Sequence, residues 1–291
     1  MATNVHGAES GGGSGADRGT AGARFRAVVV ALVVLLLPLA ACGQSTPSAD
    51  GVRDGGDASS SATAGTDWDL VLLGDSVLLA GFTLEGRLER ELGVTLQISN
   101  WLNPDVAKYA KGGERSADLV ERLRTDEELR QDLRAAEVVV FDVPLGVIYD
   151  VCPGTPGTAT SEEVARCLDE VVTMYEADVE AVFEELVALR DPADAMIRVT
   201  DVWQFFYPTF TAAGTYDVVR PRWQEMNQAV HDAAARYGIP VVAAYAGFTG
   251  PDGDRDPVAS GDVEIDQIHL SNQGVERFVD LVISEGFAPL A

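Results

Sequence analysis

This sequence of 291 residues has few basic residues, few histidines and few cysteines. Its 21 Lys and Arg stand against 46 Asp and Glu, which leaves a formal net charge of −25. Binding to nucleic acid or to an anionic lipid surface needs a basic patch, and none is visible, so we expect no nucleic-acid partner. The 3 histidines and 3 cysteines form no CxxC or HExxH pattern, so the sequence predicts no metal site and implies no cofactor.

The N-terminal residues have the pattern of an export signal. Residues 27–41 form an unbroken apolar run behind a segment that contains arginines. As a helix this run would rise only about 22 Å, less than the roughly 30 Å of a bilayer's hydrocarbon core, so it favours a secretory signal peptide over residues 1–42. The run ends in Leu-Ala-Ala-Cys, which resembles the lipobox of bacterial lipoproteins. That resemblance implies that Cys42 is lipidated at the extracytoplasmic face of the membrane; an uncleaved membrane anchor is the alternative.

A tether and one domain are expected after the signal. Residues 43–66 contain almost no large apolar side chain and cannot bury enough surface to offset the entropy of ordering. With 46% hydrophobic and 23% charged residues in the whole chain, the rest suits a globular domain. We place that domain at residues 67–291 and expect it to be a monomer.

The two remaining cysteines form a natural pair. Cys152 and Cys167 lie in a compartment that favours disulfides, and the segment between them is rich in turn residues. Closing a loop of this size would stabilise the fold by roughly 3 kcal/mol in the chain-entropy model. The sequence therefore predicts a Cys152–Cys167 disulfide, with two buried free thiols as the alternative.

Short Val-rich runs alternate with helical patterns along the domain. The runs at residues 69–73, 137–143, 196–202 and 239–243 predict strands covered on both faces. Capping boxes begin at Thr125 and Thr160, Pro221 suits the first turn of a further helix, and Ser271 suits the cap of the last one. This alternation predicts βαβ units and a mostly parallel sheet, whose functional residues lie beyond the carboxyl ends of the strands.

Two motifs at such positions contain candidate catalytic residues. The first run ends in Gly-Asp-Ser-Val, which places Ser76 at the carboxyl edge of the sheet. A nucleophilic serine needs a base, and histidine is the usual one. His6 precedes the predicted cleavage site and His231 falls in a helix pattern, where we expect a solvated face. His269 is therefore the remaining candidate for the base. Asp266, three residues earlier, could orient its ring. The alternative is that both residues only stabilise the loop and the cap of the next helix.

Together, GDSV early in the domain and DxxHLS before the last helix resemble the SGNH hydrolases, or GDSL-type lipases and esterases. The resemblance covers most of residues 67–291 and implies a three-layer α/β/α fold around a flavodoxin-like sheet. It also implies that Ser76 is the nucleophile, His269 the general base and Asp266 its orienting partner. In the family's second block it assigns Gly113, with the backbone N–H of Ser76, to the oxyanion hole.

One block departs from the family pattern. The family carries Gly-x-Asn-Asp after the third strand, where the Asn donates to the oxyanion, and here Pro144 falls about at that position. A charged Asp142 carboxylate would repel an oxyanion and cannot replace the Asn. Losing one such donor typically costs about 2.7–4 kcal/mol. Asn100 and Asn103 are possible replacements.

These features predict an extracytoplasmic, lipid-anchored or secreted serine hydrolase that cleaves a carboxylic ester through an acyl-enzyme. A binding lipoprotein on the same fold that has lost turnover is the alternative, and an unrelated solute-binding lipoprotein is a third. The ester remains open among short-chain acyl, acetylated glycan and lipid substrates. Residues 150–160 and the aromatic stretch 203–210 are candidates for the pocket wall, with core packing an equal alternative for the aromatic residues.

Overall fold

The structure is a computed structural model that describes residues 67–76, 78, 81–98, 101–103, 106–107, 110–152 and 159–290. The chain divides into two units, Met1–Ser59 and Ser60–Ala291, and all the described residues belong to the second. The predicted signal peptide with Cys42 and the predicted tether at residues 43–66 lie outside the described residues, as does Asn100. Asn103 is described in its backbone only.

A five-stranded parallel sheet forms the centre of the domain. Its strands run in the order β2-β1-β5-β6-β7, with each neighbouring pair parallel. The strands are β1 (Asp67–Leu73), β2 (Thr95–Ile98), β5 (Val138–Phe141), β6 (Met196–Thr200) and β7 (Val241–Val242). This is the flavodoxin-like strand order, so the predicted fold class is confirmed. A separate antiparallel pair is formed by β3 (Trp101–Asn103) and β4 (Val106–Ala107).

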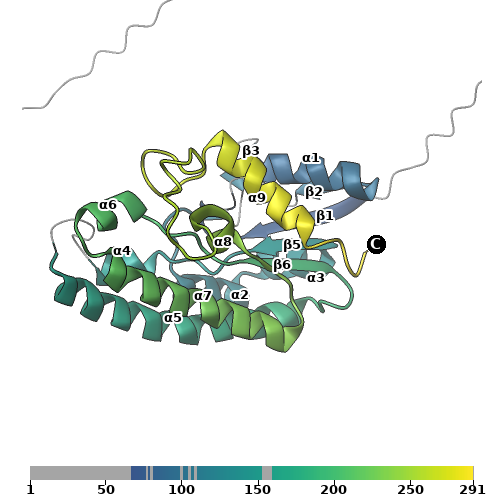
Figure 1. Ribbon diagram of the computed structural model, residues 1–291. Helices are drawn as coiled ribbons and strands as arrows, with labels where there is room; N and C mark the ends of the chain where they lie inside the picture. The colour runs from purple at the N-terminus through teal and green to yellow at the C-terminus, as the bar shows by residue number, and fades with distance from the viewer. Residues whose placement is uncertain are drawn as a thin grey trace, which may run out of the picture. The chain divides into compact units, whose positions relative to one another are not determined.

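Helices cover both faces of the sheet. Figure 1 shows α2 (Ser116–Thr125), α5 (Ser161–Leu189) and α7 (Tyr216–Tyr237) on one face, and α1 (Gly81–Leu92) and α9 (Asn272–Ser284) on the other. The remaining helices are α3 (Glu127–Ala135), α4 (Val147–Val151), α6 (Tyr207–Ala212) and α8 (Ala244–Thr249). None of the helices described in the structure is long and apolar enough to span a membrane.

Burial explains which strands can be read from the sequence. Helices cover both faces of β1 and β5, and these strands are therefore fully buried at Leu70 to Leu73 and over the whole of β5. Each of the four predicted runs coincides with a strand; β1 begins two residues before its run, and β5, β6 and β7 are shorter than theirs. In β2 Leu96 is buried while Thr95 and Gln97 on either side of it face solvent, so this edge strand has no continuous apolar run to reveal it.

The predicted helix starts are partly correct. Thr160 and Glu163 form the expected capping box of α5, and the Ser271 side chain accepts from the N–H of Gly274 at the start of α9. The predicted box at Thr125 is wrong, because Thr125 ends α2 and Asp126 caps α3 instead. Pro221 is not in the first turn of its helix either, since α7 begins at Tyr216.

The predicted disulfide is present between Cys152 and Cys167. Cys152 follows the last residue of α4, and Cys167 lies in the second turn of α5. The bond therefore ties the segment after β5 to the longest helix of the domain. Cys152 is buried and Cys167 is partly buried.

Candidate active site

Ser76 lies just beyond the carboxyl end of β1, whose last residue is Leu73. Gly74 has a φ of 142°, and a Cβ on this residue would lie 2.2 Å from Oδ1 of Asp142, so only glycine fits. The same Oδ1 accepts from the N–H of Asp75 at 3.1 Å. Gly74 and Asp142 together hold the turn that presents Ser76 at the carboxyl edge of the sheet.

The glycine turn of the second block lies beside Ser76. Ala110 pairs with Gly74 in an isolated bridge, and the N–H of Lys111 donates to the carbonyl of Gly74 at 2.8 Å. A Cβ on Gly112 would come to 3.9 Å from Cβ of Ser76. Gly113 follows with a φ of 70°, a left-handed conformation that glycine adopts freely. The two segments that the resemblance assigns to the oxyanion hole are therefore neighbours.

The glycine turn is fixed from its far side by an ion pair. Glu114 is buried, and both of its carboxylate oxygens accept from Nη1 of Arg122 on α2, at 2.7 and 2.8 Å. Its main-chain carbonyl accepts from the N–H of Gly146 at 2.9 Å. Burial raises the pKa of Glu114 despite the opposing hydrogen bond and charge of Arg122. These contacts tie the turn to α2 and to the segment after β5.

His269 and Asp266 meet Ser76 across the edge of the sheet. Nε2 of His269 lies 3.0 Å from Oγ of Ser76, and Nδ1 lies 2.7 Å from Oδ2 of Asp266. The other oxygen, Oδ1 of Asp266, accepts from the N–H groups of Ile268 and His269 at 3.0 Å each. The side chains of His269 and Asp266 are 45% and 48% exposed, so solvent and a substrate can reach them.

Hydrogen bonding keeps Asp266 ionised. Desolvation alone would raise the pKa of this carboxyl. The bonds from the His269 ring and from two main-chain N–H groups outweigh it, so the pKa of Asp266 lies below its ordinary value. An ionised Asp266 can fix the tautomer of His269 and stabilise the imidazolium that forms when the ring takes a proton.

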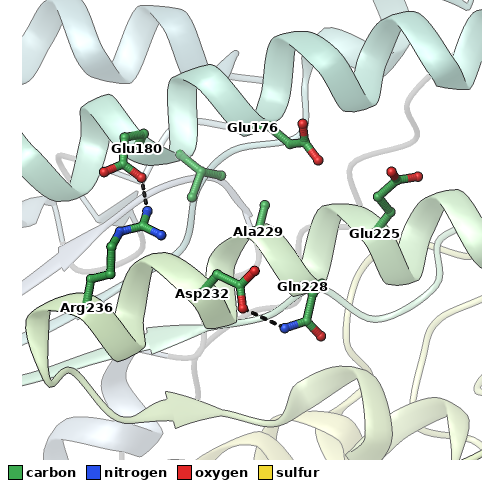
Figure 2. Close-up of a pocket in the computed structure, with 8 residues that line it drawn as sticks. Glu176, Glu180, Glu225, Gln228, Ala229, Asp232 and Arg236 are labelled. Carbon is green, nitrogen blue, oxygen red and sulfur yellow. Dashed lines mark hydrogen bonds and ion pairs between the residues drawn. The ribbon is translucent and has the colours of Figure 1, made fainter.

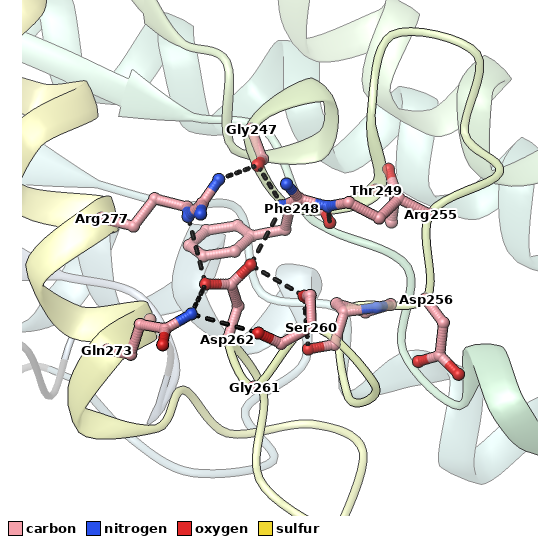
Figure 3. A network of polar contacts seen from close by, with 12 residues as sticks. Gly247, Phe248, Thr249, Arg255, Asp256, Ser260, Gly261, Asp262, Gln273 and Arg277 are labelled. Atoms are coloured by element: carbon pink, nitrogen blue, oxygen red, sulfur yellow. Dashed lines mark hydrogen bonds and ion pairs between the residues drawn. The ribbon is translucent and has the colours of Figure 1, made fainter.

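A buried carboxylate anchors the segment that leads into the Asp266 turn. Asp262 is fully buried, and Figure 3 shows four side chains converging on it: Arg255, Ser260, Gln273 and Arg277. The main-chain carbonyl of Asp262 accepts from the N–H of Ser271 at 3.0 Å. Glu264 then donates its N–H to the carbonyl of His269 at 2.8 Å. These hydrogen bonds close the turn from Glu264 to His269 and connect it to the buried contacts of Asp262.

The environment of the Asp142 carboxyl differs from what the sequence led us to expect. The carboxyl is fully buried, and its pKa is raised well above the usual range, first by desolvation and then by the nearby charge of Asp75. Its Oδ2 has no hydrogen-bond partner. Burial therefore disfavours the charged carboxylate that was expected to repel an oxyanion, and Oδ1 of Asp142 instead holds the N–H of Asp75. Pro144, at the place of the family's Asn, is buried and has no N–H to donate.

The expectation for His231 is correct in part: it lies on helix α7 with a partly solvated side chain, but it also has a buried acidic partner. Its side chain is 40% exposed, and Nε2 lies 3.0 Å from Oδ2 of Asp201, which is almost fully buried at the end of β6. The other oxygen of Asp201 accepts from the N–H of Tyr245 at 2.7 Å. The bond to Asp201 raises the pKa of His231. The signal in the sequence was an acid inside the apolar run at residues 196–202, and the pair joins α7, β6 and α8.

Several hollows lie near the described helices. One of about 470 Å³ borders Gly112 and Gly113 and has a charged lining that includes Lys111, Asp118, Glu121 and Arg122. Another of about 380 Å³ has an apolar lining around Val147, Val151 and Met174. Figure 2 shows a third, of about 260 Å³, between α5 and α7, where none of the lining residues is a member of the Ser76 site. The first hollow borders the glycine turn that follows Ala110, but Ser76, His269 and Asp266 are not among its described lining residues.

Of the two segments predicted to form the pocket wall, one is buried in the core and the other is described only in part. Trp203, Phe205 and Phe210 are at most 3% exposed, so these aromatic residues of the 203–210 stretch belong to the core. Trp203 packs edge-on against Phe205 and Phe248. In the other segment, residues 153–158 lie outside the described part of the chain.

No protein-family model and no curated protein matches this sequence. Its fold nevertheless has counterparts among solved structures. A lipase from a goat rumen metagenome superposes with a TM-score of 0.58 at 14% identity, over 77% of this chain and 100% of the lipase. An acetylxylan esterase from Geobacillus stearothermophilus gives a TM-score of 0.53 at 16% identity, over 77% of this chain and 96% of the esterase. The domain therefore has the fold of these lipases and esterases, as the sequence resemblance implies.

Proposed function

We propose that this protein is a serine hydrolase that cleaves a carboxylic ester. The observation that carries the proposal is the continuous contact from Oγ of Ser76 through His269 to Asp266, at 3.0 and 2.7 Å. A serine hydroxyl becomes a useful nucleophile when a base can take its proton, and this arrangement supplies one. The fold shared with lipases and esterases supports the same reaction class.

Each step of the reaction uses a residue at the site. Oγ of Ser76 attacks the ester carbonyl carbon while its proton moves to Nε2 of His269. The carbonyl oxygen becomes an oxyanion and accepts from the backbone N–H groups of Ser76 and Gly113. The carbon–oxygen bond to the alcohol then breaks, and His269 gives its proton to the departing alkoxide, which leaves an acyl-enzyme on Ser76. Water repeats the sequence, releases the acid and restores Ser76.

The substrate is proposed to be an ester of a short acyl group with a polar alcohol. The hollow of about 470 Å³ next to Gly112 and Gly113 carries both acidic and basic side chains, which can bind hydroxyl groups but disfavour a long acyl chain. A short acyl group on a polar alcohol fits this lining. On a series of p-nitrophenyl esters, kcat/KM is expected to be highest for acetate and to fall as the acyl chain lengthens. Equal or rising values toward the octanoate would contradict the short-acyl proposal.

A second candidate function rests on Pro144. Because proline has no N–H and no side-chain donor, Pro144 cannot supply the donor that the family's Asn gives to the oxyanion hole. A binding lipoprotein that keeps the Ser76 site but has lost turnover would fit this feature. Absence of ester turnover together with slow labelling of Ser76 by a fluorophosphonate would favour the binding protein over the hydrolase.

The anchor at the membrane's outer face is part of the proposal. Cys42 ends the Leu-Ala-Ala-Cys sequence of the apolar run. Metabolic labelling with a fatty-acid analogue in a bacterial host is expected to mark the wild-type chain and to be lost in Cys42→Ala. Full labelling of Cys42→Ala would exclude this cysteine as the lipid site.

A further inference from the structure

Two strained residues meet at the turn between Asp266 and His269. Within the described part of the chain, Phe206 and Gln267 are the only residues other than glycine with a positive φ, at 56° and 67°. The N–H of Phe206 donates to the main-chain carbonyl of Gln267 at 3.1 Å, so the two strained backbones bond directly. Strain of this kind costs on the order of 1–3 kcal/mol per residue and persists where the surroundings over-determine the conformation.

The Gln267 side chain strengthens the same connection. Its Oε1 accepts from both the N–H and the hydroxyl of Thr209, at 3.3 and 2.8 Å. Thr209 lies in the first turn of α6, where main-chain N–H groups have no partner within the helix. The residue at the N-cap position, Phe206, makes no side-chain cap. Gln267 therefore caps α6 from a segment about sixty positions later in the chain.

The next residue of the turn is held by the same part of the chain. The carbonyl of Ile268 accepts from Nε1 of Trp203 at 3.1 Å, and Trp203 is fully buried. Both residues between Asp266 and His269 are thus bonded to the segment that follows β6. Burial alone does not hold the Asp266 and His269 side chains, since nearly half of each is exposed. The bonds made by Gln267 and Ile268 are what restrict the turn on this side.

We propose that Gln267 is a positioning residue that fixes the Asp266–His269 turn to α6 and so keeps Nε2 of His269 at Oγ of Ser76. This inference rests on the proposed function. Gln267 contacts no reacting atom in this arrangement, so its removal acts on the placement of His269. A displacement of about 1 Å at a reacting group can cost on the order of a hundredfold in rate. The effect is expected in kcat, because substrate binding does not use the turn's far side.

Four variants and one control test the proposal by ester turnover. Gln267→Ala keeps the backbone strain but removes the acceptor, and kcat is expected to fall about tenfold to a hundredfold at unchanged KM. Thr209→Val removes one donor and should cause a smaller fall. The double variant is expected to be no slower than Gln267→Ala, because both changes remove one contact. Gln267→Glu keeps an acceptor oxygen and should recover most of kcat, and the exposed Gln228→Ala on α7 should match the wild type.

The same series contains the results that would overturn the proposal. They are a wild-type kcat in Gln267→Ala, losses that multiply in the double variant, or Gln267→Glu as slow as Gln267→Ala. Thermal unfolding of each variant ensures that a fall in kcat is measured on folded protein. If the wild type itself has no turnover, the proposed function fails separately. The ¹H–¹⁵N signals of the His269 ring then test Gln267: we expect them to shift or broaden in Gln267→Ala and not in Gln228→Ala, and unchanged signals would overturn the proposal.

Discussion

Nε2 of His269 lies 3.0 Å from Oγ of Ser76, although 193 positions separate the two residues in the sequence. The contact exists because Ser76 lies just beyond Leu73, the last residue of β1, and because the turn before α9 returns the chain to the same edge of the sheet. Parallel strands place their carboxyl ends together, and loops from distant segments meet there. The proposed ester hydrolysis depends on this contact between His269 and Ser76.

Removal of the base should be more damaging than removal of its partner. We expect His269→Ala to lower kcat by roughly four orders of magnitude, since no other described group replaces the proton acceptor of Ser76. Asp266→Asn should cause a smaller loss, on the order of a hundredfold to ten thousandfold, because an amide oxygen can still accept one of the bonds. Steady-state hydrolysis of p-nitrophenyl acetate measures both. Equal activity of His269→Ala and the wild type would contradict the assigned role of His269.

Gly74 should tolerate no side chain. In Gly74→Ala the new Cβ would meet Asp142 at 2.2 Å, in a backbone conformation that side chains avoid, so the turn carrying Ser76 must move. We expect a lower melting temperature and loss of ester turnover. Gly93→Ala is the matched control, because Gly93 also has a positive φ, of 68°, but has nothing within 4 Å of a Cβ. It should lose about 1–2 kcal/mol of stability and keep its turnover; unchanged turnover in Gly74→Ala would contradict the role of this close approach.

Asp142 should make stability depend on pH. An acid whose pKa is raised in the folded state contributes its full stability below its unfolded pKa of about 3.9, where both states are protonated. That stability is lost as pH rises toward the folded pKa, because only the unfolded chain ionises. Asp142→Asn cannot ionise and keeps the acceptor for Asp75. The variant should therefore gain stability relative to the wild type between about pH 4 and pH 8, as measured by urea unfolding. A constant difference across this range would show that Asp142 is ionised in the folded protein.

The contribution of His231 to stability should depend on pH as expected for a histidine with a raised pKa. Its charged form binds Asp201, so its contribution is fully present below the unfolded pKa of about 6.5 and is lost as pH rises through the folded pKa. Thermal unfolding should show a larger loss for His231→Gln at about pH 5.5 than at about pH 9. The same loss at both pH values would exclude a titrating ion pair. Ester turnover should remain, because His231 has no contact with the Ser76 site.

The sequence predicts the parts of the fold and site that depend on local patterns. Val-rich runs identify strands that helices cover on both faces, and GDSV and DxxH identify side chains at strand and helix ends. In edge strand β2 the buried Leu96 lies between the exposed Thr95 and Gln97, so the strand lacks a Val-rich run. The approach of Asp142 to Gly74 is also hidden, since it depends on how two neighbouring strands end.

Contacts between distant segments account for the other differences. The His231–Asp201 pair requires α7 to pack beside the end of β6, which helix periodicity alone cannot indicate. The connection of Gln267 to Phe206 and Thr209 depends on two left-handed backbone conformations in residues that seldom adopt them. No local pattern predicts these conformations, because the surrounding structure imposes them.

The most direct test of the central claim is the site at which an activated serine reacts. The wild-type domain is incubated with a fluorophosphonate, and mass spectrometry of the intact protein and its peptides locates the adduct. We expect one adduct, on Ser76, absent in Ser76→Ala and strongly slowed in His269→Ala, while all three proteins remain folded. Labelling of Ser76→Ala at the wild-type rate, or a wild-type protein that stays unlabelled at high reagent concentration, would contradict the assignment of Ser76 as the nucleophile.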